Sequence, residues 1–183
     1  METTLAWYGL EYNSREECTV KETRSRISIN SEIYAKSSLL DFFTIEYKLI
    51  LNSKWESISV ESSAVLITDT HHVRLQKQEN GHWLVNGEIN HELDGCIDTD
   101  IPNTPLTNTL PIKRLNLNIG ESQIIDVVYL DILFNLVRPV KQRYTRLGQN
   151  EYKYENVPND FEAVIKVDDQ GFVINYPGLF VTR

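Results

Sequence analysis

The sequence is poor in the features that would tie it to a membrane or to a nucleic acid. No apolar run approaches the ~18 residues that cross a bilayer, and the N-terminal segment lacks the basic and apolar regions of a signal peptide. Basic residues number 18 against 26 acidic ones, so the net charge of -8 argues against binding to nucleic-acid phosphates or to an anionic membrane surface. We therefore expect a soluble, cytoplasmic protein with no membrane span and no nucleic-acid partner.

Cysteine and histidine are also scarce. Cys18 and Cys96 are the only cysteines, they lie far apart, and they fit no metal-ligand spacing, so reduced thiols are expected and a disulfide between them stays open. The four histidines are His71, His72, His82 and His91. None of them falls in a His-x3-His or His-Glu-x-x-His spacing, so we expect solvated histidines in turns and strands, no metal site and no cofactor.

Motifs of the common catalytic classes are missing too. The chain has no Gly-x-Ser-x-Gly elbow, no phosphate-binding loop and no dinucleotide motif. Asp98 and Asp100 form a carboxylate pair that could perform acid–base chemistry, but nothing in the sequence places a substrate beside them. Acidic turns are frequent in proteins, so we expect no catalytic residue here.

Most of the chain predicts short β-strands. Residues 42–51 give the cleanest example, since apolar and polar side chains alternate from Phe43 to Leu51. Turn signals such as Asn80-Gly81 and Asn86-Gly87 separate roughly a dozen such strands. No linker or repeat interrupts them, so residues 1–183 are expected to form a single, mainly β domain whose sheet curls on itself.

Two segments leave their structure open. Residues 122–133 are almost continuously apolar, which fits either a strand covered on both faces or a second buried helix; their valine, isoleucine and tyrosine content favours the strand. Residues 136–147 predict a long strand, and Pro139 within it indicates a sheet edge or a bulge at that point.

One helix is expected, after an acidic turn at residues 94–100. Thr104 can cap its N-terminus with the side-chain hydroxyl, and Pro105 suits the first helical position. Leu106 and Leu110 then lie on one face, as expected for a plug that fills a curved sheet.

Pro111 should end or kink this helix. The residue before a proline avoids the α region, so the helix is expected to stop after Leu110 or to restart at Pro111 and run to Leu115.

Several long motifs resemble one known family. They are residues 93–98 (LDGCID), 104–115 (TPLTNTLPIKRL), 137–147 (VRPVKQRYTRL) and 176–180 (YPGLF). Together with Trp7, Gly9, Leu10 and Glu11 near the start, they resemble the bacterial putative glycolipid-binding family, formerly a domain of unknown function. The resemblance implies a spiral β-roll, in which one long, highly curved antiparallel sheet wraps around a single short helix. It also implies a homodimer and a lipid or glycolipid partner, and it brings no established catalytic residues.

Charged residues gather in two segments. The basic segment contains Arg138, Lys141, Arg143 and Arg146, and the acidic segment contains Glu92, Asp94, Asp98 and Asp100. The guanidinium groups of arginines on a strand could bind the phosphate, sulfate or carboxylate of a head group. Alternatively, the two segments neutralise each other, or the basic strand pairs with Glu151 and Glu155 across a hairpin, and this second interpretation is the one we favour.

The tyrosines admit two interpretations as well. Tyr144, Tyr152, Tyr154 and Tyr176 could form a cavity mouth or a sugar-stacking wall, or they could serve ordinary sheet packing. The resulting candidate ligand-binding residues are Asp94, Asp98, Arg114, Arg138, Arg143, Tyr144 and Arg146.

Three functions compete at this point. The first is non-catalytic binding of a lipid or glycolipid, which needs an apolar cavity of ~300 Å³ or more. The second is a structural or regulatory homodimer without a small ligand, which needs a filled roll. The third is an enzyme acting on an acyl or sugar substrate through Asp94, Asp98 or Arg114, which needs a polar cleft with a buried carboxylate.

Overall fold

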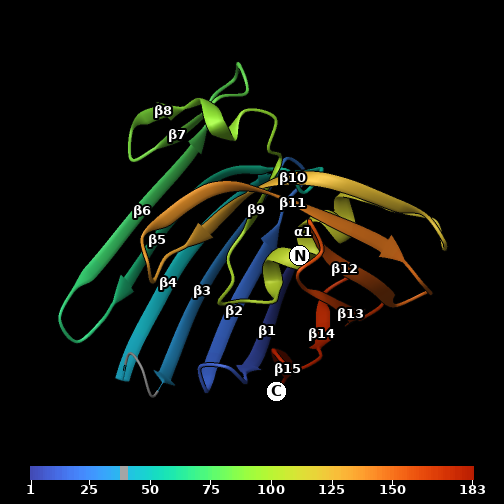
Figure 1. The fold of residues 1–183 in the computed structure, drawn as a ribbon, viewed down its shortest axis with the longest axis horizontal. Helices are drawn as coiled ribbons and strands as arrows, with labels where there is room; N and C mark the ends of the chain where they lie inside the picture. The colour runs from blue at the N-terminus through green and yellow to red at the C-terminus, as the bar shows by residue number, and fades with distance from the viewer. Residues whose placement is uncertain (38–40) are drawn as a thin grey trace.

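The computed structural model describes residues 1–37 and 41–183, and its described strands form one curved sheet (Figure 1). The strands are β1 (Glu2–Gly9), β2 (Ser14–Glu22), β3 (Arg26–Ser37), β4 (Asp41–Asn52), β5 (Ser57–Val65), β6 (Thr70–Lys77), β7 (Trp83–Val85), β8 (Glu88–Asn90), β9 (Asp98–Asp100), β10 (Ser122–Asp131), β11 (Leu136–Arg146), β12 (Glu151–Val157), β13 (Glu162–Val167), β14 (Val173–Tyr176) and β15 (Phe180–Thr182). Two helical segments accompany them, a 3-10 turn η1 (His91–Leu93) and the α-helix α1 (Leu106–Leu115). Neither helical segment has the length and apolar character needed to cross a bilayer.

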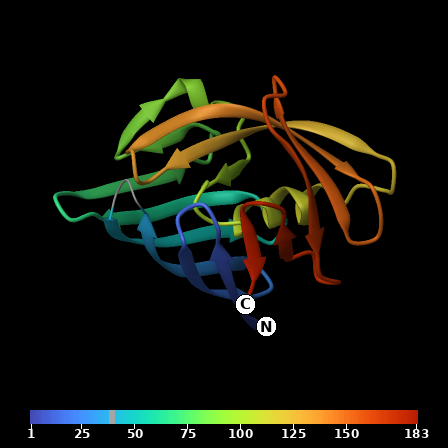
Figure 2. The same ribbon diagram turned by 60° about the horizontal axis from the view of Figure 1, so that its bottom comes forward.

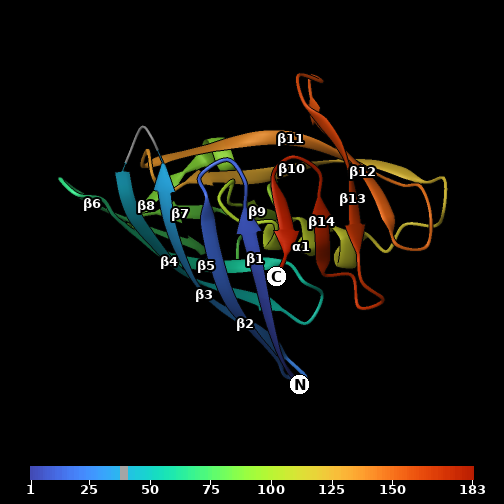
Figure 3. The same ribbon diagram turned by 90° about the horizontal axis from the view of Figure 1, so that it is seen from below.

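The two ends of the chain meet in the middle of the sheet. Strands β1 to β8 follow one another outward in one direction, and β15 back to β9 follow one another in the other direction. The two halves join where β1 pairs with β15, with Gly9 opposite Phe180 (Figure 3). The indole of Trp7 strengthens this junction by donating a 2.8 Å hydrogen bond to the carbonyl of Val173.

The sheet curls until its β9 end reaches β5 of the other half. The carbonyl of Ile97, just before β9, accepts a 3.1 Å hydrogen bond from the amide of Ser57 at the start of β5, while the Ile97 amide donates to Asp126 of β10 at 3.4 Å. Helix α1 lies within the curl, between the β1–β6 half and the β10–β14 half (Figure 2). This arrangement confirms the predicted spiral β-roll, and it departs from a wholly antiparallel sheet in one place, since β9 pairs with β10 in parallel.

The helix begins at Leu106, one residue later than predicted, and it reaches Leu115, the end predicted for a helix that restarts at Pro111. Pro105 rather than the predicted Thr104 is the N-cap residue, although the Thr104 hydroxyl still accepts a 3.1 Å hydrogen bond from the amide of Leu106. The prediction that Pro111 ends the helix after Leu110 is wrong, because α1 is continuous to Leu115. Leu110 and Ile112, on either side of the proline, are buried, so the packing of this turn offsets the one hydrogen bond that Pro111 cannot donate.

The helix separates two apolar clusters. Leu106 and Leu110 belong to the larger cluster, which fills the curl between β1–β7, η1 and β10. Ile112 belongs to the second cluster, under β10 to β15. Burial of each such side chain contributes about 1.5–3 kcal/mol to the stability of the folded state. The helix therefore works as the predicted plug, and its side chains fill the centre of the roll.

The two segments whose structure the sequence left undecided are both strands. Residues of the apolar run form β10, and Pro139 lies in β11 opposite Val128 of β10. On its other side β11 pairs with β12 only from Lys141 onward, so the proline sits at a local sheet edge where its missing amide costs no ladder bond.

Candidate ligand-binding pocket

A pocket of about 330 Å³ opens between the start of α1 and the C-terminal half of the sheet. One side of the pocket is apolar and mainly aromatic, with Ile101, Tyr154, Phe161, Tyr176, Leu179 and Phe180. The polar lining residues are Asp100, Thr104, Asn108 and Asn156, which we call the polar floor, and the exposed Glu11. A larger hollow of about 630 Å³ lies on the outer face of β1 to β6, but polar side chains and exposed backbone line it, so it offers no apolar wall.

The aromatic wall is a set of rings in edge and tilted contact. The ring centre of Tyr154 in β12 lies 6.1 Å from those of both Phe161 and Tyr176, and Tyr176 in β14 lies 6.3 Å from Phe180. Phe161 remains 37 % exposed at the margin of this wall, so a bound molecule would cover its ring. Burial raises the pKa of Tyr154 and Tyr176 well above the usual range, which keeps both hydroxyls protonated.

Asp100 is the charged group of the polar floor. Its Oδ2 accepts a 2.7 Å hydrogen bond from Nε2 of Gln142, and its Oδ1 accepts one of 3.0 Å from the Thr107 hydroxyl. Burial raises the pKa of the Asp100 carboxyl, and these two donors oppose the rise. A carboxylate has about four acceptor positions, so two protein donors leave it able to accept hydroxyls from a ligand.

A hydrogen-bond chain fixes the orientation of the floor. The Asn108 amide donates to the Tyr144 hydroxyl at 2.9 Å, and that hydroxyl donates to Oε1 of Gln142 at 3.3 Å. Because Gln142 accepts with its oxygen from Tyr144, its NH2 group must point at Asp100. The candidate residue Tyr144 therefore lies beneath the pocket, where it holds other residues in place, rather than in its wall.

A second hollow of about 230 Å³ adjoins the pocket and contains two basic residues. It shares Asp100 and Tyr154 with the pocket and adds Arg138 and Lys141 of β11. The Arg138 guanidinium lies 5.2 Å from the ring centre of Tyr129, and Lys141 forms a 2.6 Å ion pair with Asp126. Arg138 is the arginine among the candidate residues that reaches this region.

The other two candidate arginines of β11 have different partners. Arg143 pairs with Glu155 across the hairpin at 3.7 Å, which confirms the hairpin alternative for this residue. Arg146 donates to backbone carbonyls, among them those of Leu117 at 2.8 Å and Gly148 at 3.1 Å.

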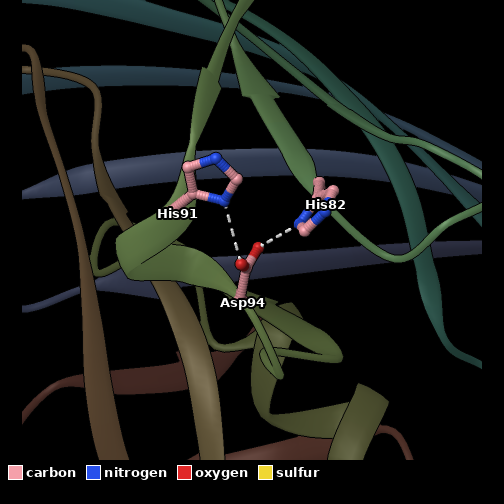
Figure 4. A group of neighbouring side chains, drawn as sticks. All are labelled: His82, His91 and Asp94. Atoms are coloured by element: carbon pink, nitrogen blue, oxygen red, sulfur yellow. Dashed lines mark hydrogen bonds and ion pairs between the residues drawn. The ribbon is translucent and has the colours of Figure 1, made fainter.

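The acidic segment likewise finds its partners elsewhere. Asp98 is bound by Arg114 of α1, with Nε of the arginine 3.0 Å from Oδ1 of the aspartate, and this pair is largely buried. Burial raises the pKa of Asp98, and the guanidinium opposes the rise. Asp94 instead lies between His82 and His91 (Figure 4). Among the ion pairs of residues 1–37 and 41–183, none joins the basic strand to the acidic turn, so the expected mutual neutralisation is wrong.

The structure thus gathers a different set of residues than the sequence suggested. Of the four tyrosines considered for a cavity mouth, Tyr154 and Tyr176 line the pocket. The ring centre of Tyr152 instead lies 5.6 Å from the guanidinium carbon of Arg146. Asp100 was noted as half of a carboxylate pair, but its role in the floor depends on Gln142, 42 positions away. Asn108 and Gln142 lie within two of the family motifs, but no sequence feature indicated a binding role for either of them, and Phe161 lies outside those motifs.

Comparison with known proteins agrees with this fold. Residues 4–182 match the model of the family described as "Putative glycolipid-binding". A crystal structure of a DUF1089 family protein from Pseudomonas aeruginosa, at 1.80 Å resolution, superposes with a TM-score of 0.80 and 32 % sequence identity over 91 % of each chain. Among curated proteins the comparison finds no match. The chain therefore belongs to the "Putative glycolipid-binding" family.

Proposed function

We propose that this protein binds the head group and first methylenes of a glycolipid or related amphipathic lipid in the pocket, without catalysing a reaction on it. The observation that supports the proposal best is the pairing of an aromatic wall, from Tyr154 and Tyr176, with the polar floor around Asp100 inside one cavity. Ligand pockets typically combine apolar walls with a few convergent polar groups. The family description points to the same class of ligand.

Each side of the pocket suits one part of such a ligand. Sugar hydroxyls can donate to the remaining acceptor positions of Asp100. The Asn156 amide accepts from Tyr154 and donates to Asp160, which leaves it one further donor and one further acceptor position. The rings of Tyr154 and Phe161 can cover the apolar face of a sugar ring or the start of an alkyl chain.

The volume limits how much of a lipid can enter. The pocket's 330 Å³ lies near the lower end of the ~300–1,000 Å³ range of small-molecule sites. The centre of the roll is occupied by side chains such as Leu106 and Leu110 of the helix. We therefore place the head group and a short stretch of chain inside, with the rest of the chain leaving past Phe161.

An acidic head group would gain a further contact. Arg138 in the adjoining hollow lies beside Tyr129, which also lines the pocket. A guanidinium in this place can bind a phosphate, sulfate or carboxylate. This contribution should weaken as salt is added, because exposed charges are screened.

Calorimetric titration with hexyl, octyl and decyl β-glucosides below their micelle concentrations, and with free glucose, tests the proposal. Affinity should rise by about 0.8 kcal/mol for each buried methylene and then level off when the pocket is full. Phe161→Ala should weaken octyl glucoside binding about tenfold, the equivalent of about 1.4 kcal/mol, whereas Phe134→Ala, at an exposed ring outside the pocket, should leave it unchanged. Folded protein that binds none of these glucosides would favour a structural or regulatory homodimer without a small ligand.

The homodimer implied by the family resemblance forms part of the same proposal. On the outer face of the sheet, Tyr34 and Val65 lie on either side of Thr44 in one cross-strand row, and Phe42 precedes that row on β4. Tyr34, Phe42 and Val65 are all exposed, so a second copy packed on this face would remove an apolar patch from water. Light scattering should give twice the mass of the chain, and a monomer across micromolar to millimolar concentrations would contradict this part of the proposal.

A reducing compartment, as in the cytoplasm, fits the two cysteines. Cys18 and Cys96 are free and buried, and the disulfide that the sequence left open is not formed. Burial raises the pKa of Cys96 to about 11 and that of Cys18 well above its usual value. Both therefore stay protonated and poorly reactive toward disulfide exchange.

A further inference from the structure

Two histidines and an aspartate meet at the free edge of the sheet, away from the pocket. Strands β7 and β8 form a hairpin in which Trp83 lies opposite Asn90, so the next residues outward, His82 and His91, are brought side by side. Asp94 follows directly after η1 and turns back toward both rings (Figure 4).

The three side chains converge on one point. Nδ1 of His82 lies 2.7 Å from Oδ1 of Asp94, and Nδ1 of His91 lies 3.1 Å from Oδ2 of the same carboxylate. The two imidazole rings stand nearly perpendicular, with centres 4.9 Å apart. One ligand atom from each residue falls within 4.8 Å of the others, so the three donors surround a common space.

We propose that His82, His91 and Asp94 bind a divalent transition-metal ion, for which Zn²⁺ is the best match. Imidazole nitrogen and carboxylate oxygen are both ordinary zinc ligands, at ~2.0–2.2 Å from the ion. Two imidazoles favour a borderline-soft ion over Ca²⁺ or Mg²⁺, which prefer oxygen ligands. Three protein donors leave a fourth position for water or for an atom of another molecule.

Only small side-chain adjustments separate the observed arrangement from a metal-bound one. Donors that share a zinc ion lie closer together than 4.8 Å, because each bond is only ~2 Å long. The His91 side chain is 71 % exposed and can rotate toward the common space without disturbing the core. The Asp94 carboxylate already faces both rings and needs the least change.

The backbone around the site is held in place by its own side chains. Oδ1 of Asn80 accepts from the amide of His82 at 3.1 Å, and Oδ1 of Asn90 accepts from the amide of Glu92 at 3.0 Å. The positions that carry the ligands are thus ordered before an ion arrives, which reduces the entropy that binding must overcome. A bound ion would join the β6–β7 turn to η1, beside the edge strand β8.

A second histidine–aspartate pair provides a matched control. Nε2 of His71 lies 3.2 Å from Oδ2 of Asp69, which is the same kind of contact with a single histidine. If the pairing of His82 and His91 with Asp94 were only hydrogen bonding, the two places would respond to metal in the same way.

Titration of chelator-treated full-length protein with Co²⁺ and with Zn²⁺ tests the proposal. Co²⁺ should produce visible absorption bands of a low-coordinate site at one ion per chain, and Zn²⁺ should displace it and raise the melting temperature. His82→Ala, His91→Ala and Asp94→Asn should each weaken Zn²⁺ binding at least tenfold, and His71→Ala should not. Circular dichroism checks that each variant is folded.

Two results would overturn the metal site. One is a wild-type protein whose Zn²⁺ affinity equals that of the His82→Ala/His91→Ala double variant. The other is an equal loss of binding in the His71→Ala control, which would point to dispersed weak histidine contacts. Because glucoside binding and zinc binding are measured separately, either proposal can fail while the other stands.

Discussion

Gln142 donates a 2.7 Å hydrogen bond from its side-chain amide to the carboxylate of Asp100, and this contact joins the long strand β11 to the short strand β9. The amide is held in this orientation, because a turned amide would place its oxygen against the carboxylate oxygen of Asp100. The Asp100 carboxylate of the polar floor is therefore held in one orientation before any ligand arrives. A preorganised acceptor of this kind is what recognition of hydroxyl groups requires.

Asp100→Asn should weaken the binding of octyl glucoside about tenfold at pH 8. Hydrogen bonds to a charged group are worth about 1.5–3 kcal/mol, against about 1 kcal/mol for neutral ones. Asparagine can keep the hydrogen bond from Gln142 by turning its oxygen toward that residue, so the fold should persist. Asp126→Asn, at an exposed carboxylate of β10, is the control for loss of charge. Equal calorimetric affinities for both variants would remove Asp100 from the site.

Leu110→Ala should lower the free energy of unfolding by about 2–5 kcal/mol. The leucine is fully buried on the face of α1 that fills the roll, so its loss opens a cavity in the larger apolar cluster. Leu147→Ala, at an exposed turn, should change stability by less than about 0.5 kcal/mol. Urea melts of both variants measure the difference, and a cost below about 0.5 kcal/mol for Leu110→Ala would refute the plug.

Glu16 should make the protein less stable as the pH rises. Its Oε1 accepts hydrogen bonds from Ser31, Tyr47 and Thr104, yet full burial raises its pKa from 4.5 to about 7. The folded state therefore holds the proton where the unfolded chain has lost it. This stabilisation is complete below pH 4.5 and is lost by about pH 7, a change of about 3 kcal/mol at about 1.4 kcal/mol per pH unit.

Comparison of the wild type with Glu16→Gln isolates that effect. Glutamine resembles the protonated carboxyl, so the wild type should lose about 3 kcal/mol relative to this variant between pH 4.5 and 7.5. Glu17→Gln, at the exposed neighbouring residue, should follow the wild-type curve. Parallel curves for the wild type and Glu16→Gln in denaturant melts would show that the Glu16 carboxyl titrates normally.

Arg114→Ala should destabilise the protein far more than Arg143→Ala. Removal of Arg114 leaves Asp98, whose side chain is 1 % exposed, as an unpaired buried charge, at a cost of about 3–5 kcal/mol. Arg143 is 40 % exposed beside Glu155, and such a pair is worth about 0–1 kcal/mol. Denaturation at pH 7 compares the two, and similar losses would mean that the Asp98 pair is solvated.

The sequence was informative where structure depends on neighbours along the chain. The strand alternation, the start of the helix to within one residue and its leucine face could all be predicted, because each rests on residues a few positions apart. The continuation through Pro111 could not, since it depends on packing of the flanking residues Leu110 and Ile112 against the sheet.

The two sites differ in how far they could have been foreseen. The pocket joins β9, β12 and β14, and the contact between Asp100 and Gln142 follows from the curl of the whole sheet rather than from any local pattern. The meeting of His82 and His91, in contrast, follows from the Asn86-Gly87 turn. A two-residue turn pairs the flanking positions in order, so the register that it sets already brings these histidines together.

A crystal structure of the protein with octyl β-glucoside would show whether the pocket holds the sugar. We expect the sugar ring in the 330 Å³ pocket, with hydroxyls within hydrogen-bond distance of Asp100 and the alkyl chain leaving past Phe161. Glucoside bound only on the outer face of β1 to β6, or an empty pocket at saturating ligand, would contradict the account.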